Sequence, residues 1–356
     1  MKKPIQTAIV GFGLSGQAFH TPFLHVHEGF EIKKVLERNK TESKKIYPNV
    51  TIVKDLKEII NDKNIDLVVI ATPNIYHYQQ ANQCLEAGKH VVIEKPFMPT
   101  SAECDEIIGL ANSKNLNIFV YQNRRWDGDF LTIKKILKTG ILAEIQYYEA
   151  HFDRYSPERK RAAWRDEQLP GSGILFDLGP HMIDQVLCLF GIPHSIKADI
   201  QSQRENSPVD DYFKISFSYP TKEVILTAGM LVEEHDLRYI IHGANGSFIK
   251  YGIDPQEDAL RKGELPGGEN WGKENPVKYG LITLDGESED FDGVIETVPG
   301  NYMEFYNNVY KVFSGEEEQE VKPVEARNVI RLIELAFKSA KQQKAIKVDL
   351  EQSIIK

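Results

Sequence analysis

The chain has 356 residues, 41% of them hydrophobic, and it is longer than one compact core usually extends, so we expect a folded protein of two domains. Its formal net charge of −9 argues against a partner that presents a phosphate backbone, and no nucleic acid is expected. Three widely spaced cysteines, Cys84, Cys104 and Cys188, form no paired motif, which excludes a disulfide framework and a cysteine zinc site.

The first residues, MKKPIQTAIVGFG, place two lysines before a short apolar strand. Gly11 and Gly13 interrupt this strand before a signal peptide or a spanning helix is complete, so we expect a cytoplasmic protein without a membrane partner. Three histidines follow, His20, His25 and His27, but no further Cys, His or Asp completes a ligand set with them. No metal is therefore expected.

Between residues 5 and 121, short apolar runs alternate with stretches of helical periodicity. The expected strands are 5–11, 30–36, 51–53, 65–71, 90–94 and 117–121, and the expected helices are 14–27, 41–46, 55–61, 74–87 and 101–114. Strands this apolar are typical of a parallel sheet that is covered on both faces. Six of them are sufficient for a doubly wound α/β fold, the Rossmann arrangement.

Three glycines, Gly11, Gly13 and Gly16, lie between the first strand and the first helix. In this context Gly11 would make the tight turn, Gly13 would let the backbone approach a diphosphate, and Gly16 would allow close packing of helix on strand. Together with Leu14 and Ser15 they would hold the diphosphate at the helix N-terminus, which favours anions. A glycine turn without a ligand is the alternative, and the alternating strands that follow weigh against it.

The second strand is followed by Glu37, about 20 positions after the glycine loop. An acidic side chain here would hydrogen-bond the adenosine ribose hydroxyls and disfavour a 2′-phosphate, which favours NAD. Arg38 and Lys40 come next, however, and a guanidinium could bind a 2′-phosphate while Glu37 turns away. The sequence therefore indicates NAD or NADP as the cofactor, with a slight preference for NAD.

The fourth strand leads into Thr72, Pro73 and Asn74, at the edge where open α/β sheets bind ligands. These residues could line the cofactor site, or Asn74 could cap the following helix. His77 lies in the first turn of that helix, where it could contact the cofactor, cap the helix or be solvated.

The fifth strand ends in Glu94 and Lys95, directly before Pro96. A lysine at a strand end that opens into the crevice is a candidate for chemistry, so we expect a catalytic Lys95 and place Glu94 beside the cofactor. Pro96 restricts Lys95 to extended conformations, which helps to aim its ammonium group. An ordinary surface lysine is the alternative.

After Trp126 the pattern changes to longer strands of alternating polarity, which predicts an α+β domain with an antiparallel sheet. The expected elements are a helix at 128–138, strands at 147–155, 211–219 and 223–231, a hairpin at 238–252 and a final helix at 323–343. The stretch 263–293 is rich in Gly, Glu, Asn and Pro and predicts a long surface excursion.

A further helix is expected within 173–191, with Pro180 near its first turn. Asp177 and His181 are four residues apart and Asp184 follows three residues later, so the imidazole could have a carboxylate partner on either side. Near a helix N-terminus the dipole favours a neutral imidazole, the form that a general base requires. A capping aspartate and a core histidine are the alternative.

Three motifs together, GFGLSG, EKP at 94–96 and the spacing of Asp177 and His181, resemble the glucose-fructose oxidoreductase / inositol dehydrogenase (Gfo/Idh/MocA) family. Further stretches resemble the branch that contains bacterial scyllo-inositol dehydrogenases: YQNRRWDGDFLTIKK, HFDRYSP, AAWRDE, GSGILFDLGPHMIDQ and GSFIKYGIDPQEDALRKG. The similarity extends over nearly the whole chain.

The resemblance implies an NAD(P)-binding Rossmann domain at 1–122 and a substrate-binding and oligomerisation domain at 123–356. The second is an α+β domain with an open, largely antiparallel sheet, whose exposed face commonly supports homodimers or homotetramers. Asn123 would lie at the hinge together with residues 124–126, where interdomain packing and ligand contact are equally open.

The implied activity is an NAD(P)-dependent dehydrogenase that interconverts a secondary hydroxyl and a ketone on a cyclic polyol or sugar, with scyllo-inositol as one candidate. The implied catalytic group is Lys95, Asp177 and His181, and Trp164 and Arg165 would lie near the cofactor. His181 would accept the hydroxyl proton, Lys95 would stabilise the reacting oxygen, and Asp177 would orient the pair.

Several polar side chains could contact such a substrate or be ordinary strand residues: Asp153, Arg154, Tyr155 and Asp211. Inositol isomers, aldoses and amino sugars all stay open as substrates. A cofactor-binding sensor without turnover and an NAD-using glycoside hydrolase are the alternative functions.

Overall fold

The computed structural model describes residues 3–158, 167–285 and 291–350. The chain forms two compact units and passes between them more than once. The first unit contains Met1–Asn123, Gln256–Trp271 and Asn301–Arg327, and the second contains Arg124–Pro255, Gly272–Gly300 and Asn328–Lys356. Two segments from the second half of the chain therefore complete the first unit.

The first unit is built on a parallel sheet in the order β3-β2-β1-β4-β5-β6. Its strands are β1 (Ile5–Val10), β2 (Phe30–Leu36), β3 (Thr51–Val53), β4 (Leu67–Ile70), β5 (His90–Ile93) and β6 (Ile118–Val120). β1, β4 and β6 are buried throughout, as expected for strands covered on both faces. The strand order reverses direction between β1 and β4, so the predicted doubly wound Rossmann sheet is confirmed.

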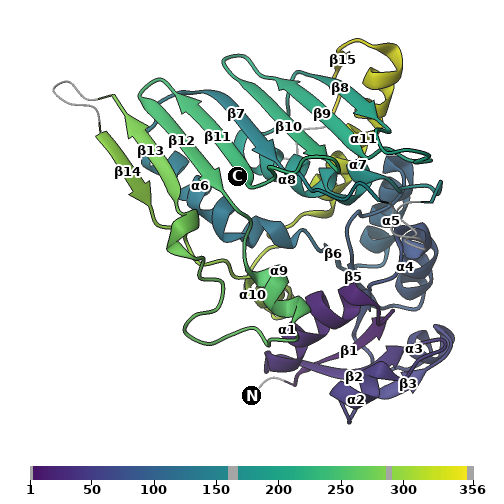
Figure 1. Ribbon diagram of the computed structural model, residues 1–356. Helices are drawn as coiled ribbons and strands as arrows, with labels where there is room; N and C mark the ends of the chain where they lie inside the picture. Colours follow the sequence, from purple (N-terminus) through teal and green to yellow (C-terminus); the bar gives the residue numbers. More distant parts are fainter. Residues whose placement is uncertain (1–2, 159–166, 286–290, 351–356) are drawn as a thin grey trace. The chain divides into compact units, whose positions relative to one another are not determined.

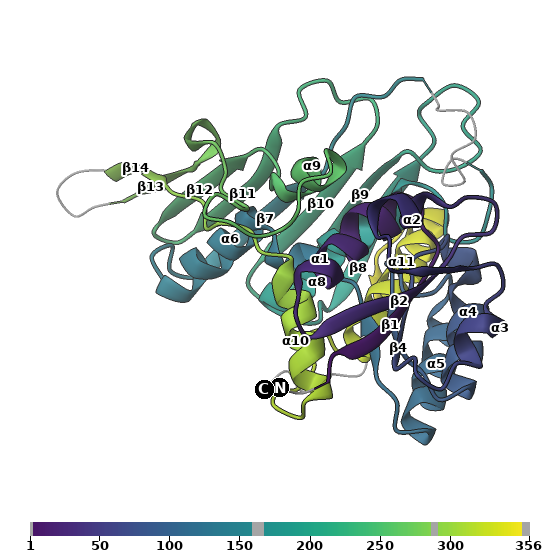
Figure 2. The ribbon, with the colours of Figure 1, turned by 90° about the horizontal axis from the view of Figure 1, so that it is seen from below.

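Helices cover both faces of this sheet (Figures 1 and 2). Those between the strands are α1 (Thr21–Val26), α2 (Glu42–Ile46), α3 (Lys57–Ile60), α4 (His77–Glu86) and α5 (Ser101–Ser113). The later segments add α9 (Gln256–Arg261) and α10 (Met303–Phe313). Both views place α4 and α5 on one face, with α1 and α10 on the other.

Helix α10 packs closely on the first unit because Gly29 has no side chain. A Cβ on Gly29 would overlap the ring of Tyr310. One turn earlier, the fully buried ring of Tyr306 stacks on Phe23 at 6.3 Å between centroids and meets Phe30 edge-on at 5.7 Å. Aromatic pairs of this kind stabilise a fold beyond the area that they bury.

The helix expected at 14–27 is divided in two. Residues Ser15–His20 form a π-helical turn, η1, and α1 begins only at Thr21. The N–H and the side-chain hydroxyl of Thr21 both donate to the carbonyl of Gly16, five residues earlier. Pro22 follows and has no N–H to continue an α-helical ladder, which favours the break at this point.

The second unit contains a nine-stranded sheet in the order β14-β13-β12-β11-β7-β10-β9-β8-β15. Its strands are β7 (Ile145–His151), β8 (Ser195–Gln201), β9 (Tyr212–Ser218), β10 (Glu223–Gly229), β11 (Leu237–Gly243), β12 (Gly246–Tyr251), β13 (Gly280–Leu284), β14 (Phe291–Ile295) and β15 (Ile346–Lys347). β7 and β10 pair in parallel and the other pairings are antiparallel, so the predicted largely antiparallel sheet is confirmed.

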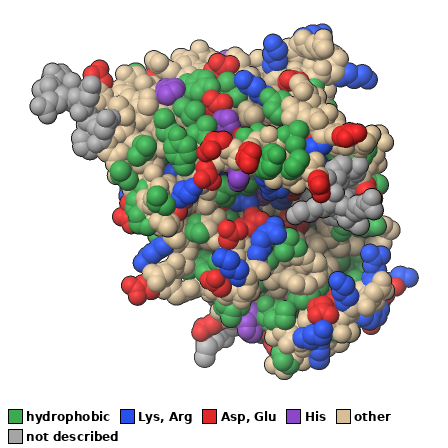
Figure 3. Space-filling view, viewed as in Figure 1, with side chains coloured by type: hydrophobic (Ala, Val, Ile, Leu, Met, Phe, Trp, Pro, Cys, Tyr) green, Lys and Arg blue, Asp and Glu red, His purple; other side chains and the backbone are tan. Residues whose placement is uncertain are grey.

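The two faces of this sheet differ. One is covered by α6 (Gly128–Thr139), α7 (Ile174–Asp177), α8 (Gly179–Phe190) and α11 (Pro323–Gln342) (Figures 1 and 2). Figure 3 shows the other face, where hydrophobic side chains gather among charged ones. Leu281 on β13 and Val294 on β14 are 50% and 62% exposed. In the described part of the chain, no helix is both long and apolar enough to cross a membrane.

The surface excursion predicted at 263–293 is wrong in its second half. β13 and β14 pair across it, with Gly280 opposite Ile295 and Leu281 opposite Val294, and they extend the sheet. Ile282 is buried while Leu281 is exposed, which is the alternation of a strand with one covered face. Gly280 permits the pairing because a Cβ there would overlap the ring of Phe248.

Asp210 holds the start of α7 in the second unit. Its carbonyl accepts from the Ile174 N–H at 3.0 Å, and its carboxylate accepts from the Leu175 N–H at 2.8 Å. Gly173 precedes this turn with φ of 92°, and a Cβ there would overlap the carboxylate. Burial raises the pKa of Asp210 to about 6, so ionisation costs more in the folded state than in the unfolded one.

The raised pKa makes Asp210 a source of pH-dependent instability. Its folded-state pKa lies above the ordinary value, so this group lowers stability as pH rises from about 4 to about 6 and keeps it lower above that. Asp210→Asn keeps the acceptor without the charge. We expect it to raise the free energy of unfolding at pH 7.5 by roughly 1–2 kcal/mol and to reduce the change between pH 4 and 6. Denaturant titrations across this pH range measure both effects.

Asp211 provides the matched control beside it. Its carboxylate pairs with the buried Arg204 at 3.0 Å and accepts two backbone N–H groups, so Asp211→Asn removes a negative charge that pairs with a buried guanidinium. This variant should lose stability at pH 7.5. A wild-type pH dependence in Asp210→Asn would contradict the role of Asp210.

Candidate active site

The glycine loop after β1 is shaped by two close backbone approaches. Gly11 has φ of 95°, and a Cβ on it would lie 2.9 Å from the Ala71 carbonyl oxygen at the end of β4. A Cβ on Gly16 would overlap the carbonyl oxygen of Gly11 itself. A Cβ on Gly13, by contrast, would meet no atom within 4 Å. Gly11 and Gly16 thus serve the loop's own fold, whereas Gly13 leaves backbone open to a ligand.

A cavity of about 400 Å³ lies beside this loop, at the carboxyl ends of β1, β2 and β4. Its lining combines open backbone, apolar rings and two cationic side chains, and it includes Gly11, Phe12, Gly13, Leu36, Glu37, Arg38, Asn39, Lys40, Ala71, Thr72, Pro73, Tyr76 and Gln80. Leu14 protrudes from the loop and Ser15 is half-buried. The residues present therefore fit a dinucleotide, with exposed backbone for its diphosphate and cations at its rim.

Glu37 does not present its carboxylate in the way expected of a ribose ligand. It is buried, and its oxygens accept from the N–H groups of Glu42 and Ser43, both at 2.9 Å, and from the Ser43 hydroxyl. These are the unpaired N–H groups at the start of α2, so Glu37 acts as the cap of that helix. The rim of the cavity at this strand end is left to the exposed Arg38 and Lys40.

The segment after β4 is tied to the segment after β5 by a buried histidine. Nε2 of His77 lies 2.9 Å from the Thr72 carbonyl oxygen, and Nδ1 lies 3.1 Å from the carbonyl oxygens of Pro96 and Phe97. Burial lowers the pKa of His77, and the solvated position considered from the sequence is wrong. Asn74 is also buried, in the short 3₁₀ turn Asn74–Tyr76 that precedes α4.

Glu94 is a buried anion at the carboxyl end of β5. It accepts from the Lys95 N–H at 2.9 Å, from the Ser15 hydroxyl, and from Nε2 of His20 at 3.0 Å. Burial by itself would raise the pKa of Glu94, but the hydrogen bonds from His20 and Ser15 and the nearby Lys95 charge outweigh it and hold this pKa at about 2. Lys95 is half-buried and is followed by a cis bond to Pro96.

In the second unit, Asp177 ends α7 and His181 lies in the first turn of α8. His181 is 4% exposed, and Nη1 of Arg154 lies 3.5 Å from the Asp177 carboxylate. Asp184 has a different task, because Arg125 donates to both of its oxygens at 2.8 and 2.7 Å. A buried bidentate pair of this kind fixes the turn before α6 against α8.

The remaining residues proposed from the sequence lie in several different elements or outside the described residues. Asn123 is buried and begins the 3₁₀ turn Asn123–Trp126, while Trp164 and Arg165 lie outside the described residues. Asp153 is buried and accepts from the Gly229 N–H at 2.8 Å, and Tyr155 is 51% exposed. Asp153, like Asp211, therefore has an evident structural role between strands.

Sequence reasoning missed the surroundings of Glu94. From the sequence, His20 is weighed only as a metal ligand. In the structure it bonds Glu94 and lies within hydrogen-bond distance of Tyr306. The order FHTPF beside the glycine loop was a signal for a buried histidine. Tyr306 lies 286 residues further along the chain, and nothing in its local sequence marks it.

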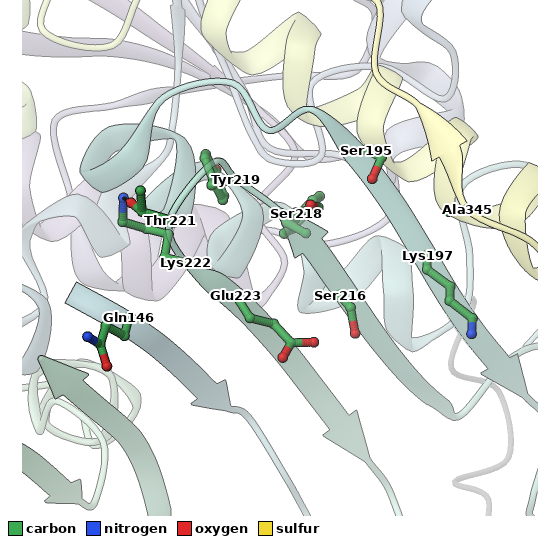
Figure 4. A pocket seen from close by; sticks show the side chains of 11 residues that line it. Gln146, Ser195, Lys197, Ser216, Ser218, Tyr219, Thr221, Lys222, Glu223 and Ala345 are labelled. Atoms are coloured by element: carbon green, nitrogen blue, oxygen red, sulfur yellow. Dashed lines mark hydrogen bonds between the residues drawn. The ribbon is translucent and has the colours of Figure 1, made fainter. Parts of the chain in front are cut away.

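A second hollow of about 410 Å³ lies on the nine-stranded sheet (Figure 4). Figure 4 shows Lys197, Ser216 and Glu223 on neighbouring strands of this hollow. It contains none of the candidate residues and no buried charged group, so we assign no chemistry to it. Within the described residues, no three His, Cys, Asp or Glu side chains are grouped to hold a metal ion.

Comparisons with known proteins agree on both units. Residues 5–122 match the model of an oxidoreductase family with an NAD-binding Rossmann fold, GFO_IDH_MocA, and residues 134–350 match the C-terminal alpha/beta domain of the same family. The chain is 41% identical to the scyllo-inositol 2-dehydrogenase (NADP(+)) IolW of Bacillus subtilis, covering 97% of this chain and 96% of the relative.

Two further relatives are equally complete. The chain is 41% identical to the uncharacterized oxidoreductase YdgJ of Escherichia coli, covering 96% of this chain and 98% of that protein. The solved structure of the oxidoreductase yvaA from Bacillus subtilis superposes with a TM-score of 0.94 at 40% identity, covering 98% of this chain and 99% of that one. The resemblance inferred from the motifs is thereby confirmed.

The three glycines should respond differently to the same substitution. Gly13→Ala adds a methyl group into open space, so we expect normal folding but at least a tenfold weaker affinity for the dinucleotide, since the methyl occupies the ligand's approach. Gly16→Ala forces a methyl group against the Gly11 carbonyl and should lower the thermal midpoint instead. Thermal denaturation and dinucleotide titration by fluorescence separate the two effects. Equal affinities in Gly13→Ala and wild type would contradict the assignment of the cradle.

Proposed function

The chain belongs to the Gfo/Idh/MocA oxidoreductase family, and on this premise we propose that it is an NAD(P)-dependent dehydrogenase acting on CH–OH groups. Its substrate in this proposal is a cyclic polyol or sugar, with scyllo-inositol as the first candidate. The observation that carries the proposal is Lys95 beside the anionic Glu94, at the sheet edge where the glycine loop and the cavity also lie. The name of the Bacillus subtilis relative supports the substrate class.

When bound, the nicotinamide dinucleotide supplies the acceptor for a hydride from the carbon that carries the hydroxyl group. The backbone at Gly13 would hold its diphosphate, and Thr72 and Pro73 would border it. Glu94 would act on the reaction indirectly, because its carboxylate accepts a hydrogen bond from the backbone N–H of Lys95.

We propose that Lys95, Asp177 and His181 act on one substrate hydroxyl. His181, which is largely buried in the first turn of α8, accepts its proton. Lys95 donates a hydrogen bond to the oxygen as negative charge develops on it. Asp177, held by Arg154, orients the pair, and in the reverse direction protonated His181 returns the proton.

We further propose NADP rather than NAD as the preferred cofactor. The slight preference for NAD depended on a carboxylate at Glu37 that is free to bind ribose hydroxyls, and this carboxylate instead caps α2. Arg38 and Lys40 are exposed at the rim of the cavity, where a 2′-phosphate would find two cations. The Bacillus subtilis relative IolW is named as an NADP(+) enzyme, which supports the same preference.

A homodimer or homotetramer and a cytoplasmic location stay predictions. The exposed apolar side chains of the open sheet face, Leu281 and Val294 among them, support an assembly in which a second copy of the chain covers them.

The cofactor preference is tested by removing the Arg38 guanidinium. We expect Arg38→Ala to weaken NADP binding about 10-fold or more and to leave NAD binding within twofold, because only NADP carries the phosphate. Lys114→Ala is the control, since Lys114 is a cation of the same unit that pairs with Glu86 at 2.7 Å. Isothermal titration with both dinucleotides measures the four affinities. Tighter binding of NAD than of NADP by the wild type would contradict the proposal.

The activity is tested by incubating the protein with scyllo-inositol, myo-inositol, glucose and glucosamine while following nicotinamide absorbance. We expect net reduction of NADP with at least one polyol, and a loss of about 10²–10⁴ in kcat for His181→Ala, the usual contribution of a general base. His235→Ala is the control, because this histidine is exposed. With a methyl glucoside added to the panel, release of the free sugar without net reduction would indicate a glycoside hydrolase, and binding without turnover would indicate a sensor.

A further inference from the structure

A chain of three buried side chains ends at Glu94 and begins on α10. Nδ1 of His20 lies 2.6 Å from the Tyr306 hydroxyl, and Nε2 lies 3.0 Å from Oε1 of Glu94. His20 and Tyr306 are both fully buried. All three belong to the first unit, so the segment 301–327 supplies one member of a network that ends beside Lys95.

The π-helical turn η1 explains why His20 can reach Glu94 together with Ser15. In an α-helix, side chains five residues apart point in different directions, because neighbours on one face are three or four apart. The i→i+5 hydrogen bonding of a π-helix widens the turn and brings residues five apart above one another. Ser15 and His20 therefore bond the same carboxylate oxygen, and the glycine loop is joined to the end of β5.

For a neutral His20, the donors and acceptors of this chain have one assignment. Ser15, His20 and the Lys95 N–H all direct donors at Glu94, so Nε2 of His20 carries the proton and Nδ1 is an acceptor. The Tyr306 hydroxyl then donates to Nδ1. Burial keeps Tyr306 protonated by raising its pKa well above the ordinary range, so this donor is present throughout the working range of pH.

We propose that Tyr306 and His20 are positioning residues that hold the Glu94 carboxylate in place, and that this fixed anion keeps Lys95 in its ammonium form. The proposal rests on the function proposed above only in assigning Lys95 to the reaction. Tyr306 fixes the tautomer of His20, His20 fixes the carboxylate, and the carboxylate favours a positive charge on the adjacent lysine. Lys95 can then donate to the substrate oxygen while His181 accepts the proton.

Other groups around Glu94 are compatible with this role. His77, on α4, interacts electrostatically with Glu94, but burial disfavours its charged form. Tyr121 packs its ring against His20 at 4.4 Å between centroids and holds the imidazole from the side of β6. Lys95 also interacts electrostatically with Glu94, and its positive charge helps to keep the carboxylate ionised.

The test measures the titration of Lys95 in the full-length protein without any substrate. Reductive ¹³C-methylation makes the lysine amines visible by NMR, and Lys95→Arg assigns the Lys95 signal. In Glu94→Gln we expect the titration midpoint of Lys95 to fall by about one pH unit, because an opposite charge nearby favours the ammonium form. A midpoint unchanged from wild type would overturn the proposal.

Tyr306→Phe tests the far end of the chain. It removes one hydroxyl and keeps the ring that stacks on Phe23, so we expect a normal fold, a Lys95 midpoint lower by roughly 0.3–0.5 unit, and the basic limb of kcat/KM displaced in the same direction. Tyr310→Phe is the matched control on the same helix, and its Lys95 midpoint should equal that of wild type. Identical midpoints in the two tyrosine variants would overturn the role of Tyr306.

Two outcomes separate this proposal from the function proposed above and from simple loss of stability. If the Lys95 midpoint moves as expected while no polyol is oxidised, the positioning chain stands and the proposed activity fails. His20→Gln retains an N–H donor for Glu94 and should keep the midpoint nearer to wild type than His20→Leu does. If both His20 variants change only the thermal midpoint and leave Lys95 unchanged, the chain is merely structural and the proposal fails.

Discussion

The close approach of Gly16 to Gly11 is the constraint that shapes the edge of the parallel sheet where the cofactor cavity lies. Because neither residue carries a side chain, the helical turn after β1 can begin directly against the loop, and the loop can lie against Ala71 at the end of β4. The π-helical turn then directs Ser15 and His20 at Glu94, whose second oxygen holds the backbone of Lys95. Three strand ends are joined in this way by backbone proximity and one shared carboxylate.

Three carboxylates of this chain show how surroundings decide what one chemical group does. Glu94 receives donors from three directions and stays ionised despite its burial. Asp210 is also buried, but its neighbours do not offset the cost of desolvation, so its pKa rises. The Glu37 carboxylate accepts hydrogen bonds from the N–H groups at the start of α2. The charged side chains at the rim of the cofactor cavity are then the cations Arg38 and Lys40. A carboxylate therefore stays ionised at Glu94, is costly to ionise at Asp210, and caps a helix at Glu37.

The sequence predicted what depends on local periodicity. Apolar runs separated by helical stretches predicted all six strands of the parallel sheet, since each run must be covered on both faces. β13 was missed because its alternation, with Leu281 exposed and Ile282 buried, is short and lies in a segment dominated by Gly, Glu and Asn. The direction of Glu37 could not be predicted, because it depends on where α2 begins in space. A glutamate at this position is compatible both with a ribose contact and with the hydrogen bond from the Ser43 N–H that the structure shows.

The discontinuity of the first unit has a chemical consequence. Tyr306 reaches His20 from a segment that the chain adds only after it has built most of the nine-stranded sheet. Phe313 of the same helix packs against Phe119 of β6, and Gln319 donates to the Ile118 carbonyl, so α10 and the segment after it complete the core as well as the polar chain. A fragment that ended after β6 would expose Phe23 and Phe30 and leave Nδ1 of His20 without its tyrosine. The segment 301–327 thus completes both the core and the polar network beside Lys95, so the first unit is not built from the N-terminal part of the chain alone.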